Sequence, residues 1–404
     1  MLFARRPAQV RFTRRPAQVR ATRLAGRLAA FVGVAAALLA GAATPAGAHG
    51  ADAPAATDYR VAVTGTVPVV DGLTVRVVEA GARLELTNRS GRPVEVLGYA
   101  GEPYLEIRPD GVYQNRRSPT AYQNETLAGD TPVPADADPA APPDWRRIAD
   151  RPVVRWHDQR TYWLDAAPPD AVRAAPDQVH RVRDWVVPLR DGVTPVELRG
   201  TLDWIPPPDP LHWWGGTLLG TVLLAVALVA TARRGRWTAQ LVSAGGLAVG
   251  GAAAVGYAMA RAVESGTGGP AGLLSVLLDG PVWALLTGLA ALAAAGYAAR
   301  RRPGAELALA LTGACLAIFA GAANAAVFTR AIAPVPGPAW WPRIVVAAAL
   351  VSGVAVTLGA VLRLRAEPVT GPGGVGRDAG DGPGSTGPDG GELARGEQRV
   401  EAQR

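Results

Sequence analysis

The sequence predicts a membrane protein in which an exported all-β domain, an antiparallel immunoglobulin-like sandwich, precedes a bundle of five transmembrane helices. Three observations lead to this prediction. A leader of the signal-peptide type comes first, short runs of alternating apolar and polar residues fill positions 59–204, and five long apolar segments follow. The alternation has the period of a β-strand, and each apolar segment has the length of a membrane-crossing helix.

Residues 1–48 have the three parts of a secretory signal peptide. An arginine-rich region extends through Arg27, an apolar run covers residues 28–43, and an Ala-Gly-Ala triplet ending at Ala48 suits a signal peptidase. Cleavage after this triplet leaves His49 as the first residue of the mature chain. An uncleaved signal anchor is the alternative, because the apolar run is near the upper end of signal-peptide length.

Residues 49–205 are predicted to form the exported β-sandwich domain. The clearest strand is VELRGTLDW, in which Val196, Leu198, Leu202 and Trp204 share one face. The run VRDWVVPL precedes it across an Arg-Asp-Gly sequence, which is typical of a hairpin turn. Many short strands at this spacing favour an antiparallel sandwich.

Three segments outside the strand pattern are rich in Pro, Gly or charged residues. A long polar insert, LAGDTPVPADADPAAPPDW at 127–145, interrupts the exported domain, and a Pro-rich linker at 206–212 leads to the membrane. Residues 363–404 carry almost no large apolar side chain, so they cannot bury enough surface to offset their ordering entropy. We predict that they form a disordered cytoplasmic tail.

Five apolar segments within residues 213–362 are each close to the ~20 residues that cross about 30 Å of hydrocarbon. They are residues 213–232, 238–260, 281–299, 305–328 and 344–362. Clusters of arginine follow the first, third and fifth segments, at 233–236, 300–302 and 363–365. By the positive-inside rule, the N-terminal domain lies outside the cell membrane and the tail lies in the cytoplasm.

The distribution of charge argues against nucleic-acid binding. The formal net charge is +7, and all 41 basic residues are arginines. Residues 49–212 nevertheless hold 18 arginines against 24 acidic residues, so the large polar domain is acidic. Positive charge gathers in the leader and at the helix ends, where a membrane protein uses it. The predicted partners are the lipid bilayer and other membrane or envelope proteins, with no nucleic acid.

Two stretches of the exported domain resemble a known family. They are GYAGEPYLEIRPDGVYQNRRSPTAY at 98–122 and WRRIADRPVVRWHDQRTYW at 145–163. Both are similar to a family of actinobacterial membrane proteins with an exported β-rich N-terminal domain, C-terminal transmembrane helices and no established activity. The resemblance implies an architecture and a compartment, and it implies no reaction.

The histidines raise one chemical hypothesis. A mature N-terminal His49 would offer an α-amine and an imidazole nitrogen, a chelate that suits copper(II). The further candidate metal ligands are His157, Asp158 and His180. A blue-copper centre is excluded because the exported domain has no cysteine, the lone Cys315 lying in an apolar run. The competing interpretation is that cleavage must leave some first residue and that the other histidines bind no metal.

The sequence contains no motif of a known catalytic site. Gly-x-Ser-x-Gly, His-Glu-x-x-His and phosphate-loop patterns are all missing. Inside the apolar segments, Asn324 is the notable polar residue. We favour the interpretation that its side chain forms an interhelical hydrogen bond over the alternative that it lines a permeation path. Gly246 and Gly250, four residues apart, would let two helices approach closely.

Three functional hypotheses follow. The first is a non-enzymatic exported binding or interaction domain held by the helical bundle, with no cofactor. The second is an exported copper-binding accessory protein that uses His49. The third is an enzyme acting on the cell envelope, for which the sequence offers no catalytic residue.

Overall fold

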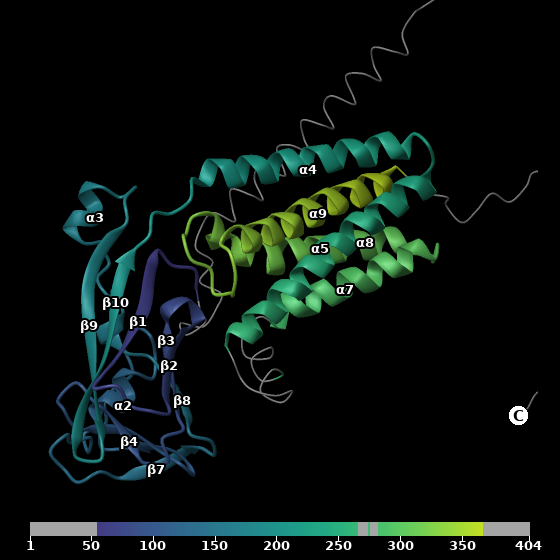
Figure 1. Ribbon diagram of the computed structural model, residues 1–404. Helices are drawn as coiled ribbons and strands as arrows, with labels where there is room; N and C mark the ends of the chain where they lie inside the picture. Colours follow the sequence, from purple (N-terminus) through teal and green to yellow (C-terminus); the bar gives the residue numbers. More distant parts are fainter. Residues whose placement is uncertain (1–54, 266–273, 275–281, 367–404) are drawn as a thin grey trace, which may run out of the picture. The chain divides into compact units, whose positions relative to one another are not determined.

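The computed structural model describes residues 55–265, 274 and 282–366. Within them, an antiparallel β region at 59–204 precedes five long apolar helices (Figure 1). The predictions of a β-rich antiparallel domain and of five helices able to span a membrane are therefore confirmed. The immunoglobulin-like sandwich stays a prediction. The signal peptide, His49 and the part of the predicted tail beyond residue 366 lie outside the described residues.

The β region contains two antiparallel sheets. The larger has the strand order β1-β10-β9-β4-β5-β6-β7, and the smaller has the order β2-β3-β8. The strands of the larger sheet are β1 (Tyr59–Val67), β4 (Val94–Leu97), β5 (Pro103–Arg108), β6 (Gly111–Asn115), β7 (Trp145–Ala149), β9 (His180–Asp191) and β10 (Thr194–Trp204). Those of the smaller sheet are β2 (Leu73–Val78), β3 (Arg83–Asn88) and β8 (Val153–Trp156).

One hydrophobic core contains side chains from both sheets. Leu86 and Trp156 come from the smaller sheet, and Leu105, Val187 and Leu198 come from the larger one. All five are buried. Burying an aliphatic or aromatic side chain of this size stabilises a fold by about 1.5–3 kcal/mol. This shared core therefore holds the two sheets together as one folding unit.

The predicted hairpin is present and is the longest in the domain (Figure 1). Asp191 pairs with Thr194 across the turn, and Gly192 adopts a φ of 61°, which glycine reaches without steric cost. The apolar residues predicted to share a face of β10 are buried. Thr201 and Asp203, which alternate with these residues along β10, are also buried, and the Asp203 carboxylate pairs with Arg181.

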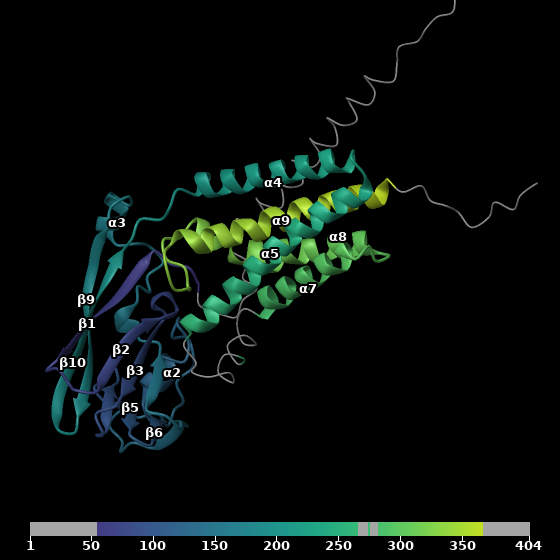
Figure 2. The ribbon, with the colours of Figure 1, turned by 45° about the vertical axis from the view of Figure 1, so that its right-hand side comes forward.

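Several short helical segments connect the strands. They are η1 (Glu79–Gly81), α2 (Pro119–Gln123), η2 (Gln159–Thr161) and α3 (Asp170–Ala174). The five long helices begin with α4 (Pro210–Ala232), α5 (Arg236–Glu264) and α7 (Val282–Ala299). The fourth consists of α8 (Ala305–Cys315) followed by η3 (Leu316–Gly321) and η4 (Ala322–Phe328), and the fifth is α9 (Trp340–Arg365). Figures 1 and 2 show them running side by side.

Helix α4 begins earlier than the predicted apolar segment, inside the stretch assigned to the Pro-rich linker. The Asp209 carboxylate accepts a hydrogen bond of 2.8 Å from the backbone N–H of Leu211, which caps the helix. Pro210 occupies the first helical turn, where its missing N–H costs nothing. Residues 210–212 are therefore helical and do not continue the polyproline linker that was predicted for 206–212.

The fourth helix changes its hydrogen-bonding pattern within the predicted segment. It is α-helical to Cys315, a π-helix over 316–321 and a 3-10 helix over 322–328. Asn324 lies in the last part and accepts a hydrogen bond of 3.3 Å from the Arg261 guanidinium of α5. The side chain also donates to the backbone carbonyl of Ala320 at 3.0 Å. The structure therefore contains the interhelical hydrogen bond that the sequence suggested.

The arginine clusters of the bundle lie near one another. The Arg301 guanidinium, after α7, lies 4.1 Å from the ring of Trp237 at the start of α5. The Arg363 side chain, at the end of α9, donates to Glu306 of α8 and to Ser243 of α5, each at 2.9 Å. All three predicted clusters thus belong to the same end of the bundle.

The loop between η4 and α9 contacts the start of the β region. Thr57 and Ile332 exchange two backbone hydrogen bonds of 2.9 and 2.8 Å. The buried Asp58 carboxylate accepts from the Arg330 guanidinium at 2.6 Å and from the backbone N–H of Ala331 at 2.8 Å. These contacts join residues more than 270 positions apart in the sequence.

Candidate ligand-binding pocket

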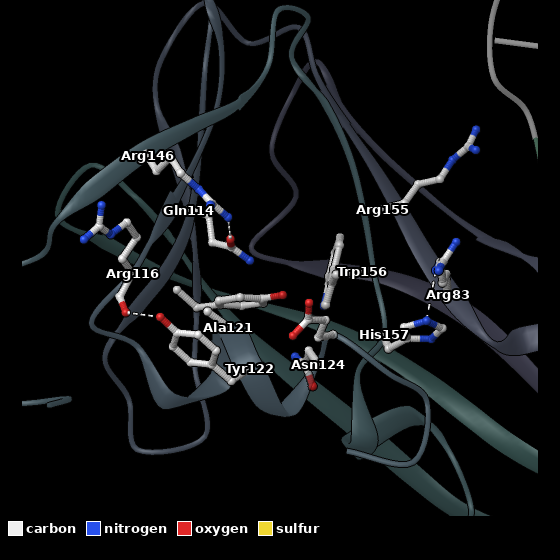
Figure 3. A pocket seen from close by; sticks show the side chains of 12 residues that line it. Arg83, Gln114, Arg116, Ala121, Tyr122, Asn124, Arg146, Arg155, Trp156 and His157 are labelled. Atoms are coloured by element: carbon white, nitrogen blue, oxygen red, sulfur yellow. Dashed lines mark hydrogen bonds between the residues drawn. The ribbon is translucent and has the colours of Figure 1, made fainter. Parts of the chain in front are cut away.

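A pocket of about 420 Å³ lies where the two sheets of the β region meet. Its walls come from β3 and β8 of the smaller sheet and from β5, β6 and β7 of the larger one, and α2 completes it. This volume falls within the range of sites that hold small molecules. The lining residues are Arg83, Tyr104, Gln114, Arg116, Ala121, Tyr122, Asn124, Glu125, Arg146, Arg155, Trp156 and His157 (Figure 3).

A buried carboxylate holds the short helix that forms one wall. Glu102 is 4% exposed, and one of its oxygens accepts hydrogen bonds from Ser118 at 2.6 Å and Thr120 at 2.8 Å. Its other oxygen accepts from the backbone N–H of Ala100 at 3.0 Å. Burial opposes ionisation here, but the donated hydrogen bonds outweigh it and hold the pKa of the Glu102 carboxyl below its usual range.

Asn124 follows this helix, and a chain of hydrogen bonds orients its side chain. The backbone N–H of Gln159 donates to the Tyr99 hydroxyl oxygen at 2.8 Å, and that hydroxyl donates to Oδ1 of Asn124. With the amide oxygen directed at Tyr99, Nδ2 is the end of the amide that faces away from this hydroxyl.

The Nδ2 atom of Asn124 is buried and forms no hydrogen bond of good geometry in the described part of the chain, although the Tyr104 hydroxyl interacts with the same side chain. The residue is 4% exposed and lines the pocket, where Figure 3 shows it in view between Tyr122 and Trp156. A buried donor left unpaired costs about 1–3 kcal/mol. A ligand with an acceptor atom at this pocket wall could form the missing hydrogen bond with Nδ2 and remove this free-energy cost.

Two of the pocket arginines have buried partners, Arg83 with Glu79 and His157, and Arg155 with Glu85. The Arg155 guanidinium donates to the Glu85 carboxylate at 2.6 Å, and Arg76 donates to the other oxygen of that carboxylate at 2.6 Å. Burial opposes the charge on Glu85, yet these two cations keep the pKa of its carboxyl below the usual range. Two guanidinium groups thus share one carboxylate, which leaves an excess of positive charge beside the pocket.

The other two arginines at the pocket mouth are exposed. Arg116 pairs with Asp144 at 3.3 Å. Arg146 donates only to the neutral amide oxygen of Gln114, at 3.2 Å, among the hydrogen bonds and ion pairs of the described residues (Figure 3). Its charge has no carboxylate partner in that part of the chain. Glu125 is the acidic residue that lines the same pocket.

Aromatic rings supply the apolar part of the walls. Tyr104 and Trp156 are buried, and the indole N–H of Trp156 donates to Asp158 at 3.0 Å. Tyr122 donates its hydroxyl proton to the Arg116 carbonyl at 3.0 Å (Figure 3). Burial raises the pKa of the Tyr104 hydroxyl, which therefore keeps its proton at neutral pH and acts as a donor.

The candidate metal ligands that fall on described residues have other partners. His157 is 3% exposed, its Nε2 accepts from Arg83 at 3.0 Å, and its Nδ1 lies 2.7 Å from the Ala82 carbonyl oxygen. Since an arginine N–H can only donate, Nδ1 carries the imidazole proton. The neighbouring Asp158 forms an ion pair with Arg160 at 2.7 Å.

His180 is placed apart from that pair, at the start of β9. Its Nε2 lies 2.7 Å from the Ala175 carbonyl oxygen. Among the described residues, no three His, Cys, Asp or Glu side chains gather closely enough to hold a metal ion. His49 lies outside the described residues, so the copper site at the mature N-terminus stays a prediction.

No pattern in the sequence indicates this pocket. Its lining residues run from Arg83 to His157 and come from both sheets, so no local pattern brings them together. The stretch that begins at Asn124 reads Asn-Glu-Thr, which matches only a glycosylation motif and gives no hint of a pocket.

No family model, no curated protein and no solved structure matches this chain in comparisons of its sequence and fold. The fold itself defines the class, an antiparallel β domain followed by five helices that could cross a membrane. Within that class, the pocket of the β domain is the feature that bears on function.

Proposed function

We propose that this chain is a multi-pass protein of the cell membrane whose β domain is an extracytoplasmic, non-enzymatic binding module. The pocket between the two sheets is its binding site. The observation that carries the proposal is the buried, unpartnered Nδ2 of Asn124 at the wall of a 420 Å³ cavity. An unpaired buried donor in a native fold calls for an explanation, and a ligand bound at this pocket wall would supply one.

The placement of the arginines supports the proposed orientation. The three clusters belong to one end of the bundle, as Arg301 on Trp237 and Arg363 on Glu306 indicate, and the positive-inside rule assigns that end to the cytoplasm. The loop that holds Arg330 contacts the β region through Asp58, which fits a β region on the opposite side. The predicted signal peptide directs the β domain outward as well.

A binding role fits the pocket better than a catalytic one. His157 has both ring nitrogens in hydrogen bonds, with Arg83 and Ala82, so its imidazole is held in place and not presented to a substrate. Burial raises the pKa of Tyr104, so the hydroxyl is a poor acid and almost no tyrosinate is present at neutral pH to act as a base. The side chains of the pocket thus supply hydrogen bonds and charge for holding a molecule.

Cysteine labelling in intact cells tests the orientation. In a Cys315→Ala background, Val193→Cys places a thiol at the tip of the β9–β10 hairpin, where Val193 is 96% exposed. A membrane-impermeant maleimide should label this variant in intact cells. The matched Arg234→Cys variant, in the loop after α4, should react only after permeabilisation. The reverse pattern would overturn the orientation.

Ligand screening tests the binding site. The full chain, in lipid nanodiscs, is screened by thermal unfolding against sugars, sugar acids, sugar phosphates and aromatic acids. A compound that binds should raise the unfolding temperature in proportion to its occupancy. The shift should disappear in Asn124→Leu and persist in Gln178→Ala, an exposed residue outside the pocket. A shift that survives Asn124→Leu would place the site elsewhere.

A further inference from the structure

We infer that the ligand of this pocket is a small organic anion, with a carboxylate or phosphate group held by Asn124 and Arg146. This inference rests on the proposed function, and it adds the chemical class of the ligand. Carboxylate and phosphate groups share negative charge and several oxygen atoms that accept hydrogen bonds.

The pocket walls hold more donors than acceptors. The Asn124 Nδ2 offers two N–H groups and forms no hydrogen bond of good geometry among the described residues, where the Tyr104 hydroxyl is the group that interacts with this side chain. Arginine side chains can only donate, and the buried Tyr104 hydroxyl keeps its proton. A molecule that satisfies such walls must bring mostly acceptors. Neutral hydroxyl groups both donate and accept, whereas carboxylate and phosphate oxygens only accept at neutral pH.

The charges at the pocket also favour an anion. Four arginines line the pocket, and Glu125 is the acidic residue among its lining side chains. Arg83 pairs with Glu79, Arg116 pairs with Asp144, and Arg155 shares the Glu85 carboxylate with Arg76. Arg146 is paired only with the neutral Gln114 amide in the described part of the chain, so an anion on the ligand would balance its charge at the mouth.

The pocket is also larger than a simple ion requires. An inorganic ion would occupy a small part of a 420 Å³ cavity and would leave the half-buried Tyr122 ring uncovered. A ligand with a six-membered ring or a chain of similar size covers this ring while its anionic group reaches the donors. The ligand is thus an organic acid or phosphate ester, and not a free anion.

The experiment compares matched pairs of compounds on the full chain in nanodiscs by isothermal titration calorimetry. The pairs are glucose with glucuronate, glucose with glucose 6-phosphate, and benzyl alcohol with benzoate. We expect the charged member of at least one pair to bind about tenfold tighter or more, as loss of a charge-assisted hydrogen bond implies. The pair that responds tells whether carboxylate or phosphate is preferred.

Variants tie the affinity to the named side chains. Arg146→Gln should weaken binding of the charged compound about tenfold and leave its neutral partner unaffected. Arg199→Gln, on the exposed face of β10 away from the pocket, should change neither affinity. Because Arg146 is exposed, its replacement leaves the fold intact, and the result does not depend on the buried Asn124.

The possible outcomes separate the two proposals. Preferential, Arg146-dependent binding of the charged members supports the inference. Equal binding of charged and neutral members, lost in Asn124→Leu, would overturn the inference and leave the binding module standing. Absence of binding by every compound of the three pairs and of the wider screen would overturn both.

Discussion

The Tyr99 hydroxyl donates its proton to Oδ1 of Asn124 while it accepts a hydrogen bond of 2.8 Å from the backbone N–H of Gln159. This link positions the Asn124 side chain at the pocket wall. Burial raises the pKa of the Tyr99 hydroxyl, so the donated proton stays in place throughout the physiological pH range. Ligand recognition by Asn124 therefore depends on a residue that does not line the pocket itself.

Replacing Tyr99 by phenylalanine should weaken ligand binding without filling or emptying the pocket. In Tyr99→Phe the Asn124 amide loses the partner that orients it, and Gln159 N–H loses its acceptor. We expect binding to weaken about tenfold and the free energy of unfolding to fall by about 1–2 kcal/mol. Titration and chemical unfolding measure the two effects.

A positioning role also predicts the affinity of a double variant. The double variant Tyr99→Phe with Asn124→Asp presents acceptor oxygens at either end of that side chain, so it should bind no better than Tyr99→Phe alone. Tyr113→Phe, which removes a surface hydrogen bond to Asp110, serves as the matched control and should retain full affinity. Unchanged affinity in Tyr99→Phe would show that Asn124 needs no such orientation.

Glu102 should make the β domain sensitive to acid. Its folded-state pKa lies below the usual value because Ser118 and Thr120 donate to the ionised carboxylate, which outweighs burial. The carboxylate therefore contributes stability that is fully present above the unfolded pKa, about 4.3, and is lost as the pH falls through the folded pKa. The unfolding free energy should thus decrease below about pH 5.

The Glu102→Gln variant separates this effect from general acid unfolding. The glutamine oxygen can accept from Ser118 and Thr120, but its NH2 group then faces the Ala100 backbone N–H, so we expect a loss of about 1–3 kcal/mol at pH 7. The variant should also lose less stability than wild type between pH 7 and pH 4. Tryptophan fluorescence during denaturant unfolding measures both. Glu197→Gln, at an exposed strand position, is the control, and an equal pH dependence in Glu102→Gln and wild type would contradict the prediction.

Two glycines hold α5 and α7 in close contact. A Cβ on Gly251 would lie 2.8 Å from the Gly288 carbonyl oxygen, and a Cβ on Gly288 would lie 2.9 Å from the Gly251 carbonyl oxygen. Both obstacles are backbone atoms, so the helices would have to separate. We expect Gly251→Ala to destabilise the bundle by about 1–3 kcal/mol.

Gly256 supplies the matched control for that prediction on the same helix. A Cβ there meets nothing within 4 Å. Gly256→Ala should leave the bundle as stable as wild type or raise its stability by up to about 1 kcal/mol, because alanine favours the helix. Thermal unfolding of both variants in one detergent gives the comparison. Equal effects of the two substitutions would show that the α5–α7 contact contributes nothing.

The fold was largely predictable because its main signals are local. An apolar segment of membrane-spanning length can be recognised from consecutive residues. So can a strand with a period of two, as at residues 196–204. The π-helix and 3-10 helix at 316–328 were not predictable, since hydropathy does not encode the hydrogen-bonding pattern of the backbone. The start of α4 at Pro210 was not predictable either, because it depends on the capping hydrogen bond of Asp209 within a proline-rich stretch.

The pocket could not be predicted, for a different reason. Arg83 contacts His157 across 74 positions, and Arg155 contacts Glu85 across 70 positions, through the pairing of β3 with β8. Strand pairing decides which distant residues become neighbours, and a single sequence contains no direct record of that pairing. Composition identified the charged residues but not the ones that share a cavity.

The hydrogen bonds of His157 give a last prediction, which concerns the copper alternative. Its Nε2 accepts from Arg83 and its protonated Nδ1 faces the Ala82 carbonyl, so neither nitrogen presents a lone pair to a metal ion. If His49 holds copper(II), binding should vanish in His49→Ala and persist unchanged in His157→Gln. Titration of the processed full chain with copper(II), followed by isothermal calorimetry, measures both affinities. His212→Gln, with an 84% exposed side chain, is the control. A loss of copper(II) affinity in His157→Gln alone would mean that these hydrogen bonds open to admit the metal.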